Sequence, residues 1–192
     1  MRERETPDLW NDAPRRPLPG DPPRRARLAR MLRVDHAGEY GAKRIYEGQI
    51  AVLGDTASGD ILRHMADQEA EHLAAFERLL AERRVRPSLL QPLWHVAGFA
   101  LGAGTALMGR RAAMACTVAV EEVIDEHYAA QRETLDDDEA DLSDTIEKFR
   151  LEELEHRDIG LANEAEQAPA YRLLSTAIKT GSRAAIWLAE RV

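Results

Sequence analysis

Two copies of a Glu-x-x-His step constrain the fold of this chain more than any other feature of its sequence. The first joins Glu69 to His72, and the second joins Glu153 to His156. Residues three apart on an α-helix share a face, so each carboxylate points the same way as its imidazole. The sequence therefore predicts two helices that each present one carboxylate and one imidazole.

A lone glutamate precedes each step by about thirty residues, Glu39 before the first and Glu121 before the second. A tyrosine follows each glutamate at i+7 and a glutamine at i+10, so the two halves of the chain repeat. Four carboxylates and two imidazoles from four helices are the ligand set of a di-iron bundle. The equivalent residues are Tyr46 and Gln49 in the first half and Tyr128 and Gln131 in the second.

Apolar residues recur at helical spacing almost everywhere after Pro23. We expect helices over about 24–53, 58–84 and 111–135, another from the acidic run 136–141 to about 162, and a last one after Pro169. Residues 88–109 carry no formal charge and connect the two hairpins. The predicted fold is all-α: a ferritin-like four-helix bundle of two αα-hairpins, with a long apolar crossover and an extra C-terminal helix.

Composition bounds the remaining possibilities. The 192 residues suit one domain, which we place at 23–192, after a proline-rich tail over 1–22 that we expect to be disordered. The net charge of −8 argues against binding to nucleic acid. The single cysteine, Cys116, excludes an internal disulfide and a cysteine-based metal site, and its apolar neighbours favour an inert buried thiol.

The glutamates divide into two groups by their place on the helices. Glu39, Glu69, Glu121 and Glu153 lie on apolar stripes, where an unpaired carboxylate would be very costly. The stripes hold too few cations to pair them, which favours a metal site over charged helix surfaces. We expect the other nearby glutamates to lie on the surface: Glu71, Glu122, Glu152 and Glu155.

One ligand position stays open, because Glu152 is four residues before His156 and could also converge on the metal. We prefer Glu153, since it reproduces the i,i+3 step of the first half. Oxygen ligands with one imidazole per ion suit iron or manganese better than zinc. We expect Glu69 and Glu153 to bridge two ions, with coordination positions left open for oxygen.

Four stretches of the sequence resemble the demethoxyubiquinone hydroxylases, which are ferritin-like di-iron monooxygenases of ubiquinone biosynthesis. The similarity covers about residues 30–192, and residues 1–29 lie outside it. The stretches are Val34-Asp35-His36-Ala37-Gly38-Glu39-Tyr40-Gly41-Ala42, Gln68-Glu69-Ala70-Glu71-His72, Ala119-Val120-Glu121-Glu122 to His127-Tyr128, and Glu152-Glu153-Leu154-Glu155-His156-Arg157-Asp158-Ile159-Gly160.

The resemblance implies two iron ions per chain. It also implies roles in substrate and electron delivery for His127 and Tyr128, with core packing as the alternative for Tyr128. Asp35 and His36, one turn before the first glutamate, could orient ligands. The implied metal ligands are the six that the stripes select: Glu39, Glu69, His72, Glu121, Glu153 and His156.

The implied reaction is hydroxylation of the ring of a polyprenyl demethoxyubiquinol by O2. Electrons must come from outside, because no Gly-x-Gly-x-x-Gly fingerprint marks a nucleotide-binding domain. Reduced nicotinamide or the quinol itself is the donor that the resemblance implies. Other ubiquinone-biosynthesis proteins are candidate partners in a complex.

The uncharged connector bears on membrane binding. Residues 88–109 are long enough to cross a bilayer, but one crossing would put the two halves of the metal site on opposite sides. The segment must return to the same side or pack along the bundle, and a buried crossover is the alternative. Trp94, the pair Arg110-Arg111 and Trp187 would suit a membrane interface. We expect a peripheral protein on the cytoplasmic side of a bacterial membrane.

Three other functions fit parts of the pattern. A ferritin-like iron-handling protein would need no apolar connector. A di-iron hydroxylase of modified tRNA would need a basic face, which this acidic chain lacks. A helical interaction bundle would bind no metal.

Overall fold

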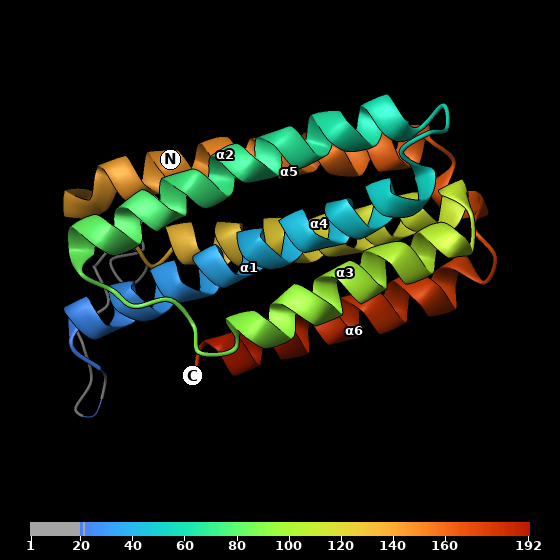
Figure 1. Ribbon diagram of the computed structural model, residues 1–192. Coiled ribbons are helices and arrows are strands. Elements are labelled where there is room, and N and C mark those ends of the chain that lie inside the picture. Colours follow the sequence, from blue (N-terminus) through green and yellow to red (C-terminus); the bar gives the residue numbers. More distant parts are fainter. Residues whose placement is uncertain (1–19, 21) are drawn as a thin grey trace, which may run out of the picture.

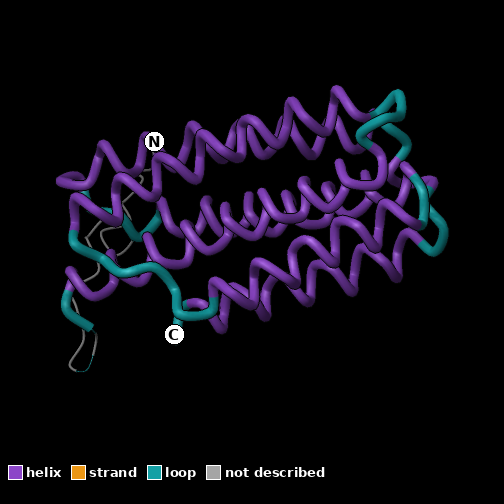
Figure 2. The backbone as a smooth tube through the Cα atoms, viewed as in Figure 1, coloured by secondary structure: helices purple, strands orange, loops and turns teal. Residues whose placement is uncertain are grey.

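Helices account for all the regular structure in the computed structural model, which describes residue 20 and residues 22–192 (Figure 2). The tail predicted over 1–22 lies almost wholly outside the described residues. The prediction of an all-α fold is confirmed. The helices are α1 (Arg24–Leu53), α2 (Gly59–Arg83), α3 (Gln91–Leu107), α4 (Arg110–Arg132), α5 (Ala140–Ala162) and α6 (Tyr171–Ala189), with 3₁₀ turns at Asp137–Glu139 and Ala165–Gln167.

The bundle is built from two similar halves (Figure 1). Helix α1 packs against α2 and α3, and α4 packs against α5 and α6. Helices α1, α2, α4 and α5 form the four-helix bundle that the repeat predicts, while α3 and α6 lie along its outer side. The predicted connector is therefore largely a fifth helix of the fold.

Glycines let α3 approach α1 closely. A Cβ on Gly102 would overlap the carbonyl oxygen of Ile45, and one on Gly48 would overlap that of Phe99. Polar contacts fix the same pair of helices, because the Tyr40 hydroxyl lies 2.7 Å from Nδ1 of His95. The connector thus packs along the bundle, one of the two arrangements that the sequence left open. No helix in the described part of the chain is long and apolar enough to cross a membrane.

Apolar clusters hold the bundle on either side of a polar layer. Along α2, Met65 belongs to one cluster and Phe76 to the next, and Glu69 and His72 lie between them. Burying each such apolar side chain contributes about 1.5–3 kcal/mol to stability. Cys116 is buried, and burial raises the pKa of its thiol to about 12, as expected for an inert residue.

Candidate metal centre

All six predicted ligands lie inside the bundle, and each is 1% exposed or less. They come from four helices and meet as two overlapping groups whose ligand atoms lie within 4.8 Å of one another. Glu69 and Glu153 belong to both groups, so their carboxylates join the two. The first group adds Glu39 and His72, and the second adds Glu121 and His156.

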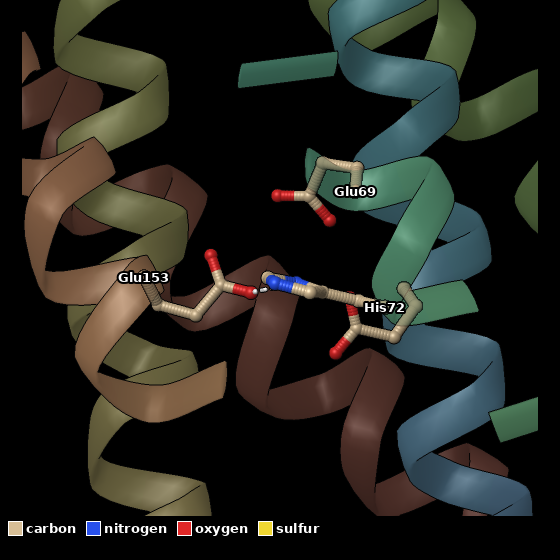
Figure 3. Close-up of side chains that lie close together, drawn as sticks. Glu69, His72 and Glu153 are labelled. Atoms are coloured by element: carbon tan, nitrogen blue, oxygen red, sulfur yellow. Dashed lines mark hydrogen bonds and ion pairs between the residues drawn. The ribbon is translucent and has the colours of Figure 1, made fainter. Parts of the chain in front are cut away.

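The imidazoles face the carboxylates with the same ring nitrogen. His72 Nδ1 lies 3.1 Å from Glu153 Oε1 and 3.5 Å from Glu39 Oε2. His156 Nδ1 lies 3.1 Å from Glu153 Oε2 and 3.3 Å from Glu69 Oε1. Figure 3 shows Glu69 and His72 projecting from α2 toward Glu153 on α5. Each group therefore offers one imidazole lone pair and three carboxylates.

Burial sets the protonation of the cluster. Desolvation, reinforced by the neighbouring carboxylates, raises the pKa values of Glu69 and Glu121 well above the ordinary glutamate value. Desolvation opposes a charged His72, yet its hydrogen bond to Glu153 and the nearby carboxylate of Glu39 raise its pKa to about 12. Desolvation likewise opposes a charged Glu153, but His156 and His72 lower its pKa to about 2. Without a metal, protons must balance part of the cluster's negative charge.

Unpaired oxygens show that these residues fit a metal. Both carboxylate oxygens of Glu69 are buried without a hydrogen-bond partner, as are one of Glu39 and one of Glu121. Such groups are costly unless a ligand satisfies them. Two divalent cations would balance the charge of four carboxylates, and oxygen with imidazole donors suits iron or manganese. The cluster can hold metal.

Tyrosine hydroxyls connect the two halves of the site. The Tyr46 hydroxyl on α1 donates to Glu121 Oε1 on α4 at 2.9 Å. The Tyr128 hydroxyl on α4 donates to Glu39 on α1. Each tyrosine of the repeat thus orients the lone glutamate of the other half.

Glu152 and Gln68 lie behind the imidazoles. Glu152 Oε2 is 2.7 Å from Nε2 of His72, and Gln68 Oε1 is 3.0 Å from Nε2 of His156. Glu152 therefore meets the edge of the ring opposite the carboxylate cluster, whereas Glu153 is completely buried within the cluster. The surface assignment of Glu71 and Glu155 agrees with their exposure, while Glu152 is only 27% exposed and contacts a predicted ligand.

An apolar cavity of about 380 Å³ lies next to the cluster, between α1, α3, α4 and α6. Glu39 and Tyr128 belong to its wall, together with Asp35 and His127. Trp94, which the sequence suggested for a membrane interface, also lines this cavity. The remaining wall is mostly small and aliphatic, including Ala42, Leu101, Val120, Ile124 and Ile186.

A short polar network fixes His127 in the cavity wall. The Gln131 side-chain nitrogen donates to Asp35 Oδ1 at 2.5 Å and lies 2.8 Å from Nε2 of His127. Asp35 is a cavity residue rather than a partner of the metal ligands, and His36 takes no part in this network. The repeat marked Gln131 in the sequence, but only the fold shows what it contacts.

Comparisons with known proteins agree with this geometry. The profile of the family described as "Ubiquinone biosynthesis protein COQ7" matches residues 26–189. A "3-demethoxyubiquinol 3-hydroxylase" from Rhodospirillum rubrum is 64% identical over 176 residues, covering 91% of this chain and 83% of that protein. A "NADPH-dependent 3-demethoxyubiquinone 3-hydroxylase, mitochondrial" from Homo sapiens is 56% identical over 172 residues, covering 88% of this chain and 79% of that protein.

Proposed function

This chain belongs to the COQ7 family of ubiquinone biosynthesis proteins, and from its buried site we propose how it works as a demethoxyubiquinol hydroxylase. The enzyme is a monooxygenase that hydroxylates the ring of a polyprenyl demethoxyubiquinol with O2, late in ubiquinone biosynthesis. One observation supports this function most directly: Glu39 belongs both to the carboxylate–imidazole cluster and to the wall of the apolar cavity. A ring bound in that cavity would lie beside the metal.

Two iron ions are the cofactor we assign to the cluster. Glu69 and Glu153 would bridge them, with Glu39 and His72 completing one position and Glu121 and His156 the other. When bound, reduced iron supplies the activation of O2, from which one oxygen atom enters the ring and the other leaves as water. Metal can bind only as protons leave the cluster, because carboxylates and imidazoles must be deprotonated to act as ligands.

Tyr128 would orient the ligand that faces the substrate. Its hydroxyl donates to Glu39, and its side chain also lines the cavity. This hydrogen bond limits the rotation of Glu39 beside the cavity. A substrate ring in the cavity would therefore meet a carboxylate held in one orientation.

His127 would hold a proton for the quinol oxygen. The amide nitrogen of Gln131 donates to Asp35 Oδ1 and lies 2.8 Å from Nε2 of His127, which is itself 3.5 Å from Asp35 Oδ1. With the second amide hydrogen of Gln131 donated to Nε2, the ring proton of His127 would reside on Nδ1. His127 would then donate Nδ1–H to a ring bound in the cavity.

The cavity wall and the outer helices suit a lipid-soluble substrate. Leu93, Val96 and Leu107 on α3 and Trp187 on α6 are exposed, next to the helices that enclose the cavity. We propose that these faces rest on the cytoplasmic side of a bacterial membrane, so that the prenyl tail enters from lipid. Arg110 and Arg111, expected to anchor this contact, also pair with Glu164.

The electron donor would be external. The human relative is named as NADPH-dependent, and we propose reduced nicotinamide as the donor for this chain too. A complex with other ubiquinone-biosynthesis proteins would bring donor and substrate together.

A labelling experiment tests the reaction. The purified protein, reconstituted with iron(II), is given a short-tailed demethoxyubiquinol, reduced nicotinamide and oxygen-18 gas. The hydroxylated ring should carry one labelled oxygen by mass spectrometry. A hydroxylated ring without the label, whose new oxygen came from water, would contradict the proposed function. An unchanged ring would contradict it as well.

A further inference from the structure

The two imidazoles of the cluster have different hydrogen-bond partners behind them. His72 on α2 contacts the carboxylate of Glu152 on α5 at 2.7 Å. His156 on α5 contacts the amide oxygen of Gln68 on α2 at 3.0 Å. Because Nδ1 of each ring faces the carboxylates, a metal on Nδ1 leaves the ring proton on Nε2. Both rings then donate, one to a charged acceptor and one to a neutral acceptor.

Gln68 and Glu152 occupy equivalent places in the repeat. Each comes one residue before a shared carboxylate, Glu69 or Glu153, and each supports the imidazole of the other half. The six ligands match between the halves. Gln68 and Glu152, the residues behind the two rings, differ by one charge. The symmetry of the six ligands therefore does not extend to the residues that contact the imidazoles from behind.

We propose that this difference makes the two metal positions unequal, with the position of His72 binding its ion more tightly. The inference rests on the metal site of the proposed function. A carboxylate that accepts the ring N–H raises the basicity of an imidazole ligand and fixes its orientation more strongly than a neutral amide does. Glu152 acts through His72 and is therefore a positioning residue.

The tighter position is the one beside the cavity. Its group contains Glu39, which lines the cavity, while the other group contains Glu121, which is tied to Tyr46. Lys148 lies 3.6 Å from the second oxygen of Glu152, but this lysine is 62% exposed and solvent weakens the pair. The Glu152 carboxylate therefore still acts as a charged acceptor behind His72. The ion at the His72 position, nearest the substrate cavity, binds first.

Stepwise metal binding to the full-length protein tests the inference. Metal-free protein is titrated with cobalt(II) by calorimetry, and the cobalt-shifted, exchangeable imidazole N–H protons are followed by NMR. We expect two steps of unequal affinity and two separate N–H signals. Glu152→Gln should weaken the tighter step about 10-fold and shift only the N–H signal of His72.

The reverse exchange sharpens the test. Gln68→Glu should strengthen the weaker step about 10-fold and shift only the other signal. The double variant, Gln68→Glu with Glu152→Gln, should restore two unequal steps with the environments of the signals exchanged. Glu155→Gln, which removes a charge from the exposed face of α5, is the matched control and should change neither step nor signal.

The outcomes separate this inference from the proposed function. Failure of the wild-type protein to bind two ions would overturn both. Two ions that bind with equal affinity, or N–H signals that Glu152→Gln and Gln68→Glu leave in place, would overturn the inference alone. An equal loss of both steps in Glu152→Gln would do the same, since it would mean general disruption of the site.

Discussion

The two halves of the bundle share their proposed metal ligands but differ in what surrounds them. In the first half, the residue four before the lone glutamate is Asp35, and in the second it is Thr117. Gln131 donates to Asp35 at 2.5 Å, whereas Gln49 lies 3.5 Å from Thr117 and donates to the carbonyl of Ala113. The same glutamine thus serves a cavity on one side and helix packing on the other.

A second pair of equivalent positions differs in chemistry within the same cavity. His127, six residues after Glu121, and Ile45, six residues after Glu39, both line it, one with a polar ring and one with an apolar side chain. The residues of the repeat thus build the carboxylate–imidazole cluster, while Asp35 and His127, which depart from the repeat, line the cavity proposed for the substrate. Experiments that make the two sides more alike should remove activity without removing metal.

Loss of a shared ligand should have the largest effect. Glu69→Ala removes a carboxylate from both groups, so we expect loss of both ions and of all turnover while the helical circular dichroism signal persists. Metal analysis and an activity assay measure this directly. Glu71→Ala, on the exposed face of α2, is the control. Equal damage from the two variants would contradict the ligand assignment.

Replacing His127 by the residue of the equivalent position should come next. His127→Ile removes the proton donor from the cavity wall, and we expect kcat to fall about 100-fold, as for loss of a general acid. Metal content should stay normal, because His127 is not a ligand. Normal turnover in this variant would show that the cavity needs no imidazole.

Removing the hydroxyl of either tyrosine should lower kcat by a smaller factor, and the two variants should differ. Tyr128→Phe removes the hydrogen bond to the cavity-lining Glu39, and we expect kcat to fall roughly 10-fold at unchanged metal content. Tyr46→Phe removes the equivalent bond to Glu121, away from the cavity, and should cost less activity. If Tyr46→Phe proves the more damaging, the cavity is not the side where chemistry occurs.

Substitutions on the outer face of α3 should change the turnover of long-tailed substrates only. Replacing Leu93, Val96 and Leu107 by glutamine should release the protein from lipid vesicles in a flotation assay and raise KM severalfold for a long-tailed quinol. A short-tailed analogue should be turned over as before. Exposed Leu151 and Leu161 on α5 provide the matched control. A triple variant that loses its metal would instead make α3 part of the core.

The smallest effect concerns pH and thermal stability. In the metal-free protein the pKa values of Glu69, Glu121 and His72 are raised, so the folded state binds more protons than the unfolded state. It should therefore lose stability as pH rises above 6.5, the ordinary pKa of a histidine, toward the folded-state pKa of His72 of about 12. The low pKa of Glu153 adds no pH dependence in that range. Metal competes with protons, so the loaded protein should gain stability over the same range.

Scanning calorimetry measures this pair of slopes. A change of 1 kcal/mol corresponds to about 2–4 °C in Tm for a chain of this size. Parallel slopes with and without metal would mean that the ion does not displace protons from the cluster.

Sequence periodicity predicted the six residues that meet in the buried cluster but not their surroundings. Helical spacing put Glu69 and His72 on one face, and the repeat supplied the other four residues. Spacing alone could not separate Glu153 from Glu152, because i,i+3 and i,i+4 both share a face. Only packing shows that Glu153 enters the cluster and Glu152 supports His72 from behind.

The cavity could not be predicted from the sequence, for a different reason. Periodicity shows that one face of a helix is buried, but not which helix covers it. Residues 88–109 were read as a connector that either returns at a membrane or packs along the bundle. Gly48 on α1 and Gly102 on α3 let the two helices approach closely, which shows that the segment packs along the bundle. Such contacts depend on tertiary geometry and cannot be read from periodicity.

A crystal structure of the cobalt-loaded protein with a short-tailed quinone analogue tests the central claim most directly. Anomalous scattering should locate two ions, one beside Glu39 and His72 and one beside Glu121 and His156. The analogue ring should occupy the cavity, nearer the first ion and within hydrogen-bond distance of His127 Nδ1. A single ion, or a ring bound nearer the Glu121 position, would contradict the division of the site into a cavity side and an enclosed side.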